Sequence, residues 1–420
     1  MKLSDELTWR GLIKDKTLSN LAWLDEPKSF YHGVDASSDS LTIGNLAALL
    51  MAKRLQAAGW RTIILVGGGT SLIGDPGGKE TERELKDPAE IKANAAAIQT
   101  QLEKLFAGQP FSLVNNQDWL SDLKLLDFLR EIGKHFSMTE LMQRDFIAER
   151  MGEGGSGISY AEFSYSLIQG YDFWNLYKNY QTVLQIGGSD QWGNMLSGVA
   201  LIRKKEGAEA HALSMPLVVD KISGRKFGKS EAGAIWLAAD KTSPTQFYQF
   251  WINTDDSDVE DYLKIFTFLP GREIDQIIRQ HQQSPGGRQA QQVFARQVTA
   301  LVHGSTAISV AEGITKYLTS QVSMATATAD ELTAMRQAIP SISVSAGSSI
   351  ISALVRSGLT ASNSEARRLL SNGAIYINGN NVAREAFQDN DFQNGRLLLR
   401  RGKAYKDSAL IELSQGQNDS

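Results

Sequence analysis

Two lysines and a serine lie close together near the middle of the chain. The segment 226–230 is Lys-Phe-Gly-Lys-Ser, so that Lys226, Lys229 and Ser230 carry its polar groups. Lysines at this spacing can neutralise the negative charge that develops on a leaving pyrophosphate. A pattern this short also recurs by chance, and an exposed loop without a ligand is the alternative.

Three polar side chains share one face of a predicted helix. Tyr165, Gln169 and Asp172 follow one another at intervals of four and three residues, which brings them onto the same helix face. Because the neighbouring Phe163 and Leu167 are apolar, this polar stripe either faces solvent or binds a polar ligand. A phenol, an amide and a carboxylate together suit a ligand that both donates and accepts hydrogen bonds.

A second polar set lies on an extended segment near the N-terminus. Tyr31, Gly33 and Asp35 occupy alternate positions, and alternate residues of a strand face the same side. A glycine between the two polar residues lets a phosphate approach the backbone. Further along, Lys79 and Arg83 form a basic pair four residues apart in a glycine-containing loop or at a helix start, a pattern that is also typical of an exposed surface.

Alternating strands and helices must position these side chains. The apolar segments predicted to be buried strands are 62–66, 111–114, 182–186 and 213–219. A helix is predicted at 88–106, with Asp87 at its N-cap and Pro88 at its first position. The alternation predicts an α/β fold with a doubly wound, Rossmann-like parallel sheet. Ligands bind beyond the carboxyl ends of the strands in such a sheet. Glycine-rich segments at 67–69, 74–78 and 187–188 follow predicted strands or lie in the loops beyond them.

The second half of the chain changes character. Helices are predicted at 244–253, 259–268, 288–302 and 331–339, which indicates an all-α domain. Two short helices and several strands then predict a small α+β domain, with helices at 350–357 and 364–370 and strands at 374–378, near 396–400 and at 404–411. The expected limits are 1–220 for the catalytic domain, 221–233 for the lysine-bearing loop, 234–340 for the helical domain, 341–349 for a serine-rich linker and 350–415 for the small domain.

The charge of the chain is unevenly distributed. The whole chain has a net charge of −4, which argues against a nucleic-acid partner. Residues 348–410, however, hold nine Lys or Arg against five Asp or Glu, a net charge of +4 that leaves −8 on the remainder. A basic module on an acidic body predicts binding of RNA, with an exposed cationic surface as the alternative. The candidate RNA-binding residues are Arg367, Arg368, Arg400, Arg401 and Lys403.

Several motifs together resemble one family. The segment 226–230 resembles the KMSKS signature of class I aminoacyl-tRNA synthetases. Further segments are similar to bacterial tyrosyl-tRNA synthetases and occur in the family's order, at 30–35, 72–76, 162–173, 187–194 and 243–251. The basic tail resembles the small RNA-binding domain of the same enzymes. The resemblance covers almost the whole chain, and it implies a ligase that activates tyrosine with ATP and transfers it to the 3′ end of its tRNA.

The resemblance also implies roles for individual residues. Tyr31 and Asp172 would bind the phenolic hydroxyl of tyrosine, while Tyr165, Gln169 and Asp75 would hold its ammonium group. The residues implied to bind tyrosine are Tyr31, Asp75, Tyr165, Gln169, Asp172 and Gln191. Those implied to bind ATP or the adenylate are Gly33, Asp35, Ser37, Gly44, Gly188, Asp190 and Lys229. Those implied in catalysis are Lys79, Arg83, Thr42, Asn45, Lys226, Lys229 and Ser230.

One motif departs from the family. Where the family has two histidines at the start of a helix, this chain has Thr42 and Asn45, with Gly44 retained between them. The helix N-terminus still offers N–H groups to phosphate, and Asn45 can donate from its amide. We expect an active enzyme. A non-catalytic RNA-binding protein on a synthetase scaffold is one alternative, and the tryptophan enzyme is another, although indole has no hydroxyl for Tyr31 and Asp172.

Composition limits the cofactors and the compartment. The chain has no cysteine, which excludes disulfides and thiolate metal sites. We expect ATP with Mg²⁺ as substrate and no protein-bound metal or organic cofactor. No apolar run approaches the roughly 20 residues that span a bilayer, so no membrane partner is expected and the cytoplasm is the expected compartment. By resemblance the partners are tyrosine, ATP, tRNA and a second copy of the chain.

Overall fold

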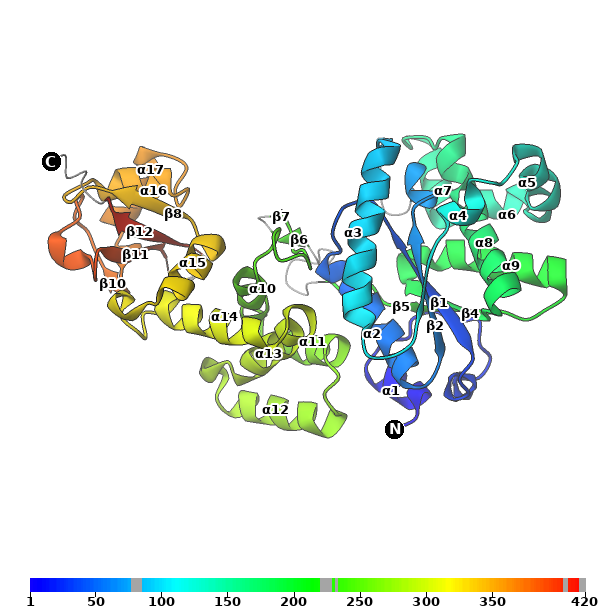
Figure 1. The fold of residues 1–420 in the computed structure, drawn as a ribbon, viewed down its shortest axis with the longest axis horizontal. Coiled ribbons are helices and arrows are strands. Elements are labelled where there is room, and N and C mark those ends of the chain that lie inside the picture. The colour runs from blue at the N-terminus through cyan, green and yellow to red at the C-terminus, as the bar shows by residue number, and fades with distance from the viewer. Residues whose placement is uncertain (77–84, 220–228, 231–232, 403–406, 415–420) are drawn as a thin grey trace. The chain divides into compact units, whose positions relative to one another are not determined.

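The computed structural model describes residues 1–76, 85–219, 229–230, 233–402 and 407–414. The chain forms two compact units. The first contains Met1–Ala238 and Asp256–Arg279, and the second contains Ala239–Asp255 and Gln280–Ser420. Each unit has its own sheet, coloured mainly blue to green in the first and yellow to red in the second (Figure 1).

The first unit is built on a parallel sheet of five strands in the order β3-β2-β1-β4-β5. Their bounds are β1 (Ser29–Asp35), β2 (Arg61–Gly67), β3 (Ser112–Asn115), β4 (Leu184–Gly188) and β5 (His211–Met215). From β1, the strands β2 and β3 are added toward one edge of the sheet, and β4 and β5 are added toward the other edge. The strand order therefore reverses between β1 and β4. A doubly wound sheet binds its ligands at such a reversal. The predicted Rossmann-like fold is confirmed.

Four long helices cover this sheet. They are α2 (Ile43–Ala57), α3 (Pro88–Phe106), α8 (Tyr160–Tyr180) and α9 (Trp192–Glu206). Helices α2 and α3 lie on one side of the sheet, and α8 and α9 on the other (Figure 1). The N-cap prediction for α3 is confirmed, because the Asp87 carboxylate accepts a hydrogen bond from the Ala89 N–H at 2.7 Å. Tyr31 of β1 and the alternate residues Ile63 and Leu65 of β2 share a buried cluster with Phe173 of α8, so this face of the sheet packs against that helix.

Shorter helices complete the first unit. They are α1 (Leu3–Trp9), α4 (Gln117–Leu120), α5 (Leu125–Glu131), α6 (Met138–Met142), α7 (Asp145–Met151) and α11 (Val259–Phe266). Helix α12 (Gly271–Gln283) continues into the second unit. The helical domain expected at 234–340 is therefore divided differently, since 256–279 clusters with the sheet-bearing unit. A further two-stranded hairpin consists of β6 (Lys229–Ser230) and β7 (Gly233–Ala234).

The second unit combines helices with a small sheet. Its helices are α10 (Pro244–Ile252), α13 (Gln289–His303), α14 (Ser305–Leu318), α15 (Ala329–Ala338), α16 (Ile350–Arg356) and α17 (Asn363–Ser371). The buried Trp251 ring packs edge-on against Phe294, with centroids 4.9 Å apart. The sheet has the order β10-β9-β11-β12-β8. Its strands are β8 (Ser341–Val344), β9 (Ile375–Ile377), β10 (Asn380–Asn381), β11 (Arg396–Arg401) and β12 (Ser408–Leu413).

Two sequence-based expectations differ from this unit. The linker expected at 341–349 begins instead with β8, which pairs in parallel with β12. The serines of 341–345 mask a strand pattern, because Ile342 and Val344 alternate with them and both pack into the small domain's core. Helix α14 was not predicted, and its Thr, Ile, Val and Gly residues have low helix propensity. No helix among the described residues is long and apolar enough to cross a membrane.

Candidate active site

A continuous chain of hydrogen bonds joins the polar residues at the carboxyl ends of β1, β2 and β3 to helix α8. The Tyr165 hydroxyl donates to Asp35 Oδ2 at 3.1 Å, and the Thr70 hydroxyl donates to Asp35 Oδ1 at 3.2 Å. Asn116 Nδ2 donates to Thr70 Oγ1 at 3.0 Å and to Asp172 Oδ2 at 2.9 Å. The two carboxylates implied in ligand binding are thus connected through residues of the fold itself.

Glycine at position 67 makes this approach possible. A Cβ atom there would lie 2.5 Å from both Asp35 Oδ1 and Thr70 Oγ1, far closer than van der Waals contact. Gly67 is the last residue of β2 and pairs with Asp35 across the sheet. A larger residue would therefore displace the Asp35 carboxylate from Thr70.

The Asp172 carboxylate is buried and partly satisfied. It is 2% exposed, and it accepts hydrogen bonds from Asn116 and from the Trp119 indole N–H, the latter at 2.7 Å. Burial raises the pKa of Asp172 to about 7, although the two hydrogen bonds lower it. A carboxylate has about four lone-pair positions, so two protein donors leave room for a ligand hydroxyl.

The Tyr31 phenol lies near this carboxylate without a partner. It is 1% exposed, and its hydroxyl makes no hydrogen bond to any residue that the structure describes. Burial and the charge of Asp172 raise the pKa of Tyr31 well above its ordinary value, so it remains a neutral donor and acceptor. A buried polar group without a partner costs about 1–3 kcal/mol, which a bound ligand with a hydroxyl would remove.

Carboxylates surround the Tyr165 hydroxyl. The charges of Asp35, Asp75 and Asp172 all raise the pKa of Tyr165, after the larger effect of burial. Asp75 is itself buried and accepts a hydrogen bond from Gln191 Nε2. Gln169 lies one turn after Tyr165 in α8 and is half-buried. This concentration of negative charge suits a cationic group on a ligand.

Two glycines near the carboxyl ends of β1 and β4 differ in whether the fold itself requires glycine. A Cβ at Gly33 would make only ordinary contacts, 3.8 Å from Leu65 Cδ2, so the fold does not require glycine there. At Gly188, in contrast, a Cβ would lie 2.5 Å from Asp190 Oδ1. Gly188 therefore allows the exposed Asp190 to fold back over the backbone. Ser37 and Gly44 are also exposed.

Thr42 and Asn45 cap helix α2. Asn45 Oδ1 accepts hydrogen bonds from both the backbone N–H and the hydroxyl of Thr42, each at 3.0 Å. The Thr42 hydroxyl proton is therefore used within the chain. The exposed Asn45 keeps its amide Nδ2 available to a ligand near the helix N-terminus.

The predicted cationic residues are described only in part. Lys226, Lys79, Arg83 and Lys403 lie outside the described residues. Lys229 and Ser230 form β6, in which Lys229 pairs with Ala234. Just beyond this hairpin, the Ile43 N–H donates to the Ile235 carbonyl at 3.1 Å. The backbone next to the hairpin is thereby bound to the first residue of α2.

The basic residues of the small domain divide into two groups. Arg367 and Arg368 are exposed on α17, and neither makes a salt bridge to a described residue. Arg400 lies over the Tyr376 ring at 5.0 Å. Arg401 pairs with Glu365 and Asp407 at 3.6 Å each, which places the end of β11 beside the start of α17.

Sequence reasoning missed Thr70, Asn116 and Trp119. Their hydrogen bonds hold Asp35 and Asp172 in place. Asn116 lies two residues after the predicted strand 111–114, and Thr70 follows the glycines 67–69 after the predicted strand 62–66, so their place beyond strand ends is the signal that could have identified them. The spacing of Trp119 gives no such signal, because it depends on the turn made by α4.

Comparisons with known proteins give a consistent result. Residues 24–319 match the family model described as tRNA synthetases class I (W and Y). Residues 331–406 match the model described as the Tyrosine--tRNA ligase SYY-like C-terminal domain. The chain is 43% identical over 415 residues to a Tyrosine--tRNA ligase of Listeria innocua, covering 96% of this chain and 98% of that protein. It is 44% identical over 414 residues to Tyrosine--tRNA ligase 1 of Bacillus licheniformis, covering 95% and 97%.

Solved structures agree. A C-terminally truncated mitochondrial tyrosyl-tRNA synthetase of Aspergillus nidulans matches with a TM-score of 0.69 and 32% identity, over 76% of this chain and 94% of that one. A tryptophanyl-tRNA synthetase of Encephalitozoon cuniculi matches with a TM-score of 0.52 and 15% identity, over 79% and 91%. The latter likeness concerns the fold alone.

Proposed function

The chain belongs to the class I tRNA synthetases of the tryptophan and tyrosine group and is a tyrosine–tRNA ligase; from this premise we propose how its site recognises and activates tyrosine. Tyrosine, ATP and tRNA are its substrates. In the first step the tyrosine carboxylate attacks the α-phosphate of ATP. A new P–O bond forms as the bond to pyrophosphate breaks. In the second step a ribose hydroxyl at the 3′ end of tRNA takes the tyrosyl group and AMP leaves.

Tyr31 and Asp172 recognise the tyrosine hydroxyl. The observation that supports this most strongly is the buried Tyr31 hydroxyl, which has no partner among the described residues, beside a carboxylate with acceptor capacity to spare. The substrate hydroxyl donates to Asp172 and accepts from Tyr31. Phenylalanine would leave both groups buried and unsatisfied, so the site rejects it. Tryptophan has no hydroxyl to offer, which argues against the tryptophan enzyme.

The substrate's ammonium group binds among Tyr165, Gln169 and Asp75. The support is the negative charge gathered around Tyr165 and the bond from Gln191 that orients Asp75. Binding the ammonium here leaves the substrate carboxylate free to face the ATP bound beside Gly33. Positioning of this kind lowers the barrier without a covalent intermediate.

ATP binds along the strand ends that carry Gly33, Asp35 and Ser37 on one side and Gly188 and Asp190 on the other. Gly33 is exposed, and an added Cβ would meet other residues only at 3.8 Å or more, which suits close approach of a phosphate. Gly44 and the amide of Asn45 lie at the N-terminus of α2, where a helix favours negative charge. Mg²⁺ is proposed to enter with ATP, because it commonly binds proteins through substrate phosphates and only one or two carboxylates.

Four cationic side chains and one hydroxyl stabilise the departing pyrophosphate. They belong to Lys79, Arg83, Lys226, Lys229 and Ser230. Lysine and arginine side chains act here through electrostatic attraction to the developing charge. The support within the described residues is the backbone bond between Ile235 and Ile43, which places the hairpin of Lys229 next to the α2 N-terminus. Thr42 contributes through its bond to Asn45, whose amide then faces the phosphates.

The small domain binds tRNA. Arg367 and Arg368 offer exposed charge on α17, and Arg400 and Arg401 lie on β11. Lys403, outside the described residues, is proposed to bind RNA with them. We infer a cytoplasmic enzyme, because the relatives named above are tyrosine–tRNA ligases of the bacteria Listeria innocua and Bacillus licheniformis.

A second copy of the chain covers an apolar face formed by α5, α6 and the start of α8. Leu125, Leu126, Met138 and Tyr160 are 70%, 77%, 57% and 71% exposed. These elements pack together through Phe128, Leu141 and Phe163, so the exposed apolar residues belong to one region. Apolar patches on the surface of a folded protein mark interaction sites, and a homodimer is proposed here.

Pyrophosphate exchange tests this function. The rate of exchange between ATP and labelled pyrophosphate is measured with each amino acid in turn. Exchange that requires tyrosine supports the proposal. Exchange with tryptophan alone would show the tryptophan enzyme, and a protein that binds tRNA without any exchange would show the non-catalytic alternative.

A further inference from the structure

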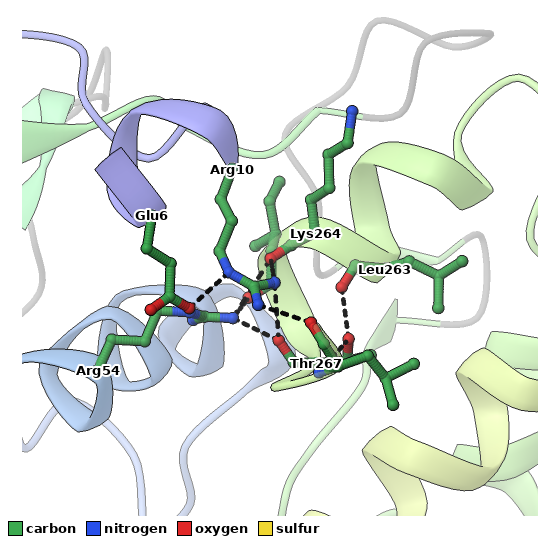
Figure 2. Close-up of polar contacts among 8 residues, drawn as sticks. Glu6, Arg10, Arg54, Leu263, Lys264 and Thr267 are labelled. Atoms are coloured by element: carbon green, nitrogen blue, oxygen red, sulfur yellow. Dashed lines mark hydrogen bonds and ion pairs between the residues drawn. The ribbon is translucent and has the colours of Figure 1, made fainter. Parts of the chain in front are cut away.

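Three segments that are distant in sequence meet around two buried arginines. Arg10 of α1 donates from Nε to Glu6 Oε1 at 2.8 Å, and Arg54 Nε of α2 lies 3.7 Å from the same oxygen. Figure 2 shows both guanidinium groups directed at the end of α11. Glu6, Arg10 and Arg54 are called the arginine cluster below.

The arginine cluster binds the carbonyl groups that end α11. Arg10 donates to the carbonyls of Lys264 at 2.7 Å and Leu269 at 2.8 Å. Arg54 Nη2 donates to the carbonyls of Ile265, at 3.0 Å, and Thr267. The last carbonyls of a helix have no partner within it and carry partial negative charge. The cluster therefore fixes the end of α11 against α2.

This junction lies in the protein interior. The side chains of Arg54 and Arg10 are 1% and 2% exposed. Burial and the charge of Arg10 lower the pKa of Arg54 to about 9, and the Glu6 carboxylate acts in the opposite direction. Removing one member of a buried charge cluster leaves an uncompensated group and is strongly destabilising. The junction is thus expected to contribute strongly to the stability of this unit.

Helix α11 holds the chain where it enters the lysine-bearing segment, which is the loop expected at 221–233. The Tyr262 hydroxyl donates to the Val219 carbonyl at 3.3 Å. Val219 is the last described residue before 220–228, and Tyr262 lies one turn before the carbonyls that Arg54 binds.

The residues before α2 hold the chain where it leaves the same segment. The Ile43 N–H donates to the Ile235 carbonyl at 3.1 Å, and the Leu237 N–H donates to the Leu41 carbonyl at 2.8 Å. Ile235 directly follows β7, in which Ala234 pairs with Lys229. Lys229 is therefore linked to the first residue of α2 through one strand pair and one backbone hydrogen bond.

We propose that Arg54 is a positioning residue for adenylate formation. It fixes α11 relative to α2, and these two elements hold the two ends of the lysine-bearing segment. Arg54 thereby determines where Lys229 lies relative to the N-terminus of α2, although it touches no substrate itself. This inference rests on the proposed role of Lys229 at the pyrophosphate.

The kinetic test compares Arg54 with an arginine that makes the same kind of bond elsewhere. In the second unit, Arg288 Nη2 donates to the carbonyls of Ile252 at 2.8 Å and Thr254 at 2.9 Å, at the end of α10. Arg54→Met should lower kcat for tyrosine-dependent exchange about tenfold, with KM for tyrosine unchanged. Arg54→Lys should restore part of the loss. Arg288→Met should lower the thermal midpoint and leave kcat unchanged. Equal kcat for Arg54→Met and the wild type would overturn the proposal.

A double-mutant cycle separates positioning from a general structural effect. If Arg54 acts through Lys229, then adding Arg54→Met, or Arg54→Lys where the methionine variant does not fold, to Lys229→Met should cost almost nothing further. Independent, additive losses would overturn the inference while leaving the proposed role of Lys229 intact. Full activity of Lys229→Met alone would instead contradict that role, and the inference with it.

Discussion

The Trp119 indole N–H donates to the Asp172 carboxylate at 2.7 Å. This bond orients a carboxyl whose burial raises its pKa to about 7. Trp119 and Asn116 both lower that pKa and so favour the ionised form of Asp172, the form proposed to accept the substrate hydroxyl. If Asp172 recognises tyrosine as proposed, specificity should also depend on Trp119 and Asn116, two residues that need not touch the substrate.

The Trp119 bond predicts a shift in the pH dependence of tyrosine binding. Asp172 gains a proton as the pH falls through about 7, so tyrosine affinity should fall below that pH. Trp119→Phe removes one effect that lowers the pKa, and the loss of affinity should then begin at a higher pH. Titration of tyrosine binding at a series of pH values checks this. Asp172→Asn serves as the control without the titration, and an unshifted profile in Trp119→Phe would refute the role given to the indole.

Gly33 predicts a separation of stability from activity. A Cβ at this position meets only ordinary contacts in the chain, and glycine within a strand costs about 0.5–1 kcal/mol relative to alanine. Gly33→Ala should therefore be as stable as the wild type or more so. It should still lower kcat/KM for ATP about tenfold, because the methyl group occupies space proposed for phosphate. Denaturant unfolding and exchange kinetics measure the two effects. Normal ATP kinetics would remove Gly33 from the site.

The α2 cap predicts different results for its two residues. Asn45→Ala removes both capping bonds and the free amide, so it should cost about 1 kcal/mol of stability and also slow adenylate formation. Thr42→Val removes only the hydroxyl, which donates to Asn45. It should lower stability with little change in kcat. Single-turnover adenylate formation and thermal unfolding distinguish the two. Equal losses of rate would show that Thr42 acts on the phosphates directly.

The exposed arginines of α17 predict a defect confined to tRNA. Reversing both charges, with Arg367→Glu and Arg368→Glu, should raise KM for tRNA and reduce its salt dependence, since fewer phosphate contacts release fewer counterions. Pyrophosphate exchange should be unaffected. An aminoacylation assay at several salt concentrations measures this. The variant would refute the assignment if charging and exchange fell together or if charging did not change.

Much of the sheet-bearing unit could be predicted from local pattern. Buried strands and the capped helix α3 follow from apolar runs and from Asp87 and Pro88, whose effects act within a few residues. The period-two alternation also identified Tyr31 and Asp35 as sharing one face. The expectations that failed concerned elements that depend on long-range pairing or whose apolar pattern is interrupted by polar residues. β8 lay hidden because serines alternate with Ile342 and Val344, and only pairing with β12 makes the strand evident.

Spacing alone could group the candidate binding residues, but it could not identify the residues that hold them in place. Tyr165 and Asp172 could be placed on one helix face by spacing alone. Asn116 and Trp119 reach Asp172 from a different strand–helix connection, at sequence separations of 56 and 53 residues. The arginine cluster likewise joins residues more than 200 positions apart, with Arg10 and Lys264 separated by 254. Sequence spacing holds no information about such contacts.

The pairing of Tyr31 and Asp172 with a substrate hydroxyl is tested most directly by amino-acid discrimination. The ratio of kcat/KM for tyrosine to that for phenylalanine is measured by pyrophosphate exchange in the wild type, in Tyr31→Phe and in Asp172→Ala. Tyr31→Phe should lower the ratio about tenfold, because one hydrogen-bond partner is removed. Asp172→Ala should lower it much further, since its buried carboxylate makes the stronger bond. A ratio that stays at the wild-type value in both variants would contradict the account.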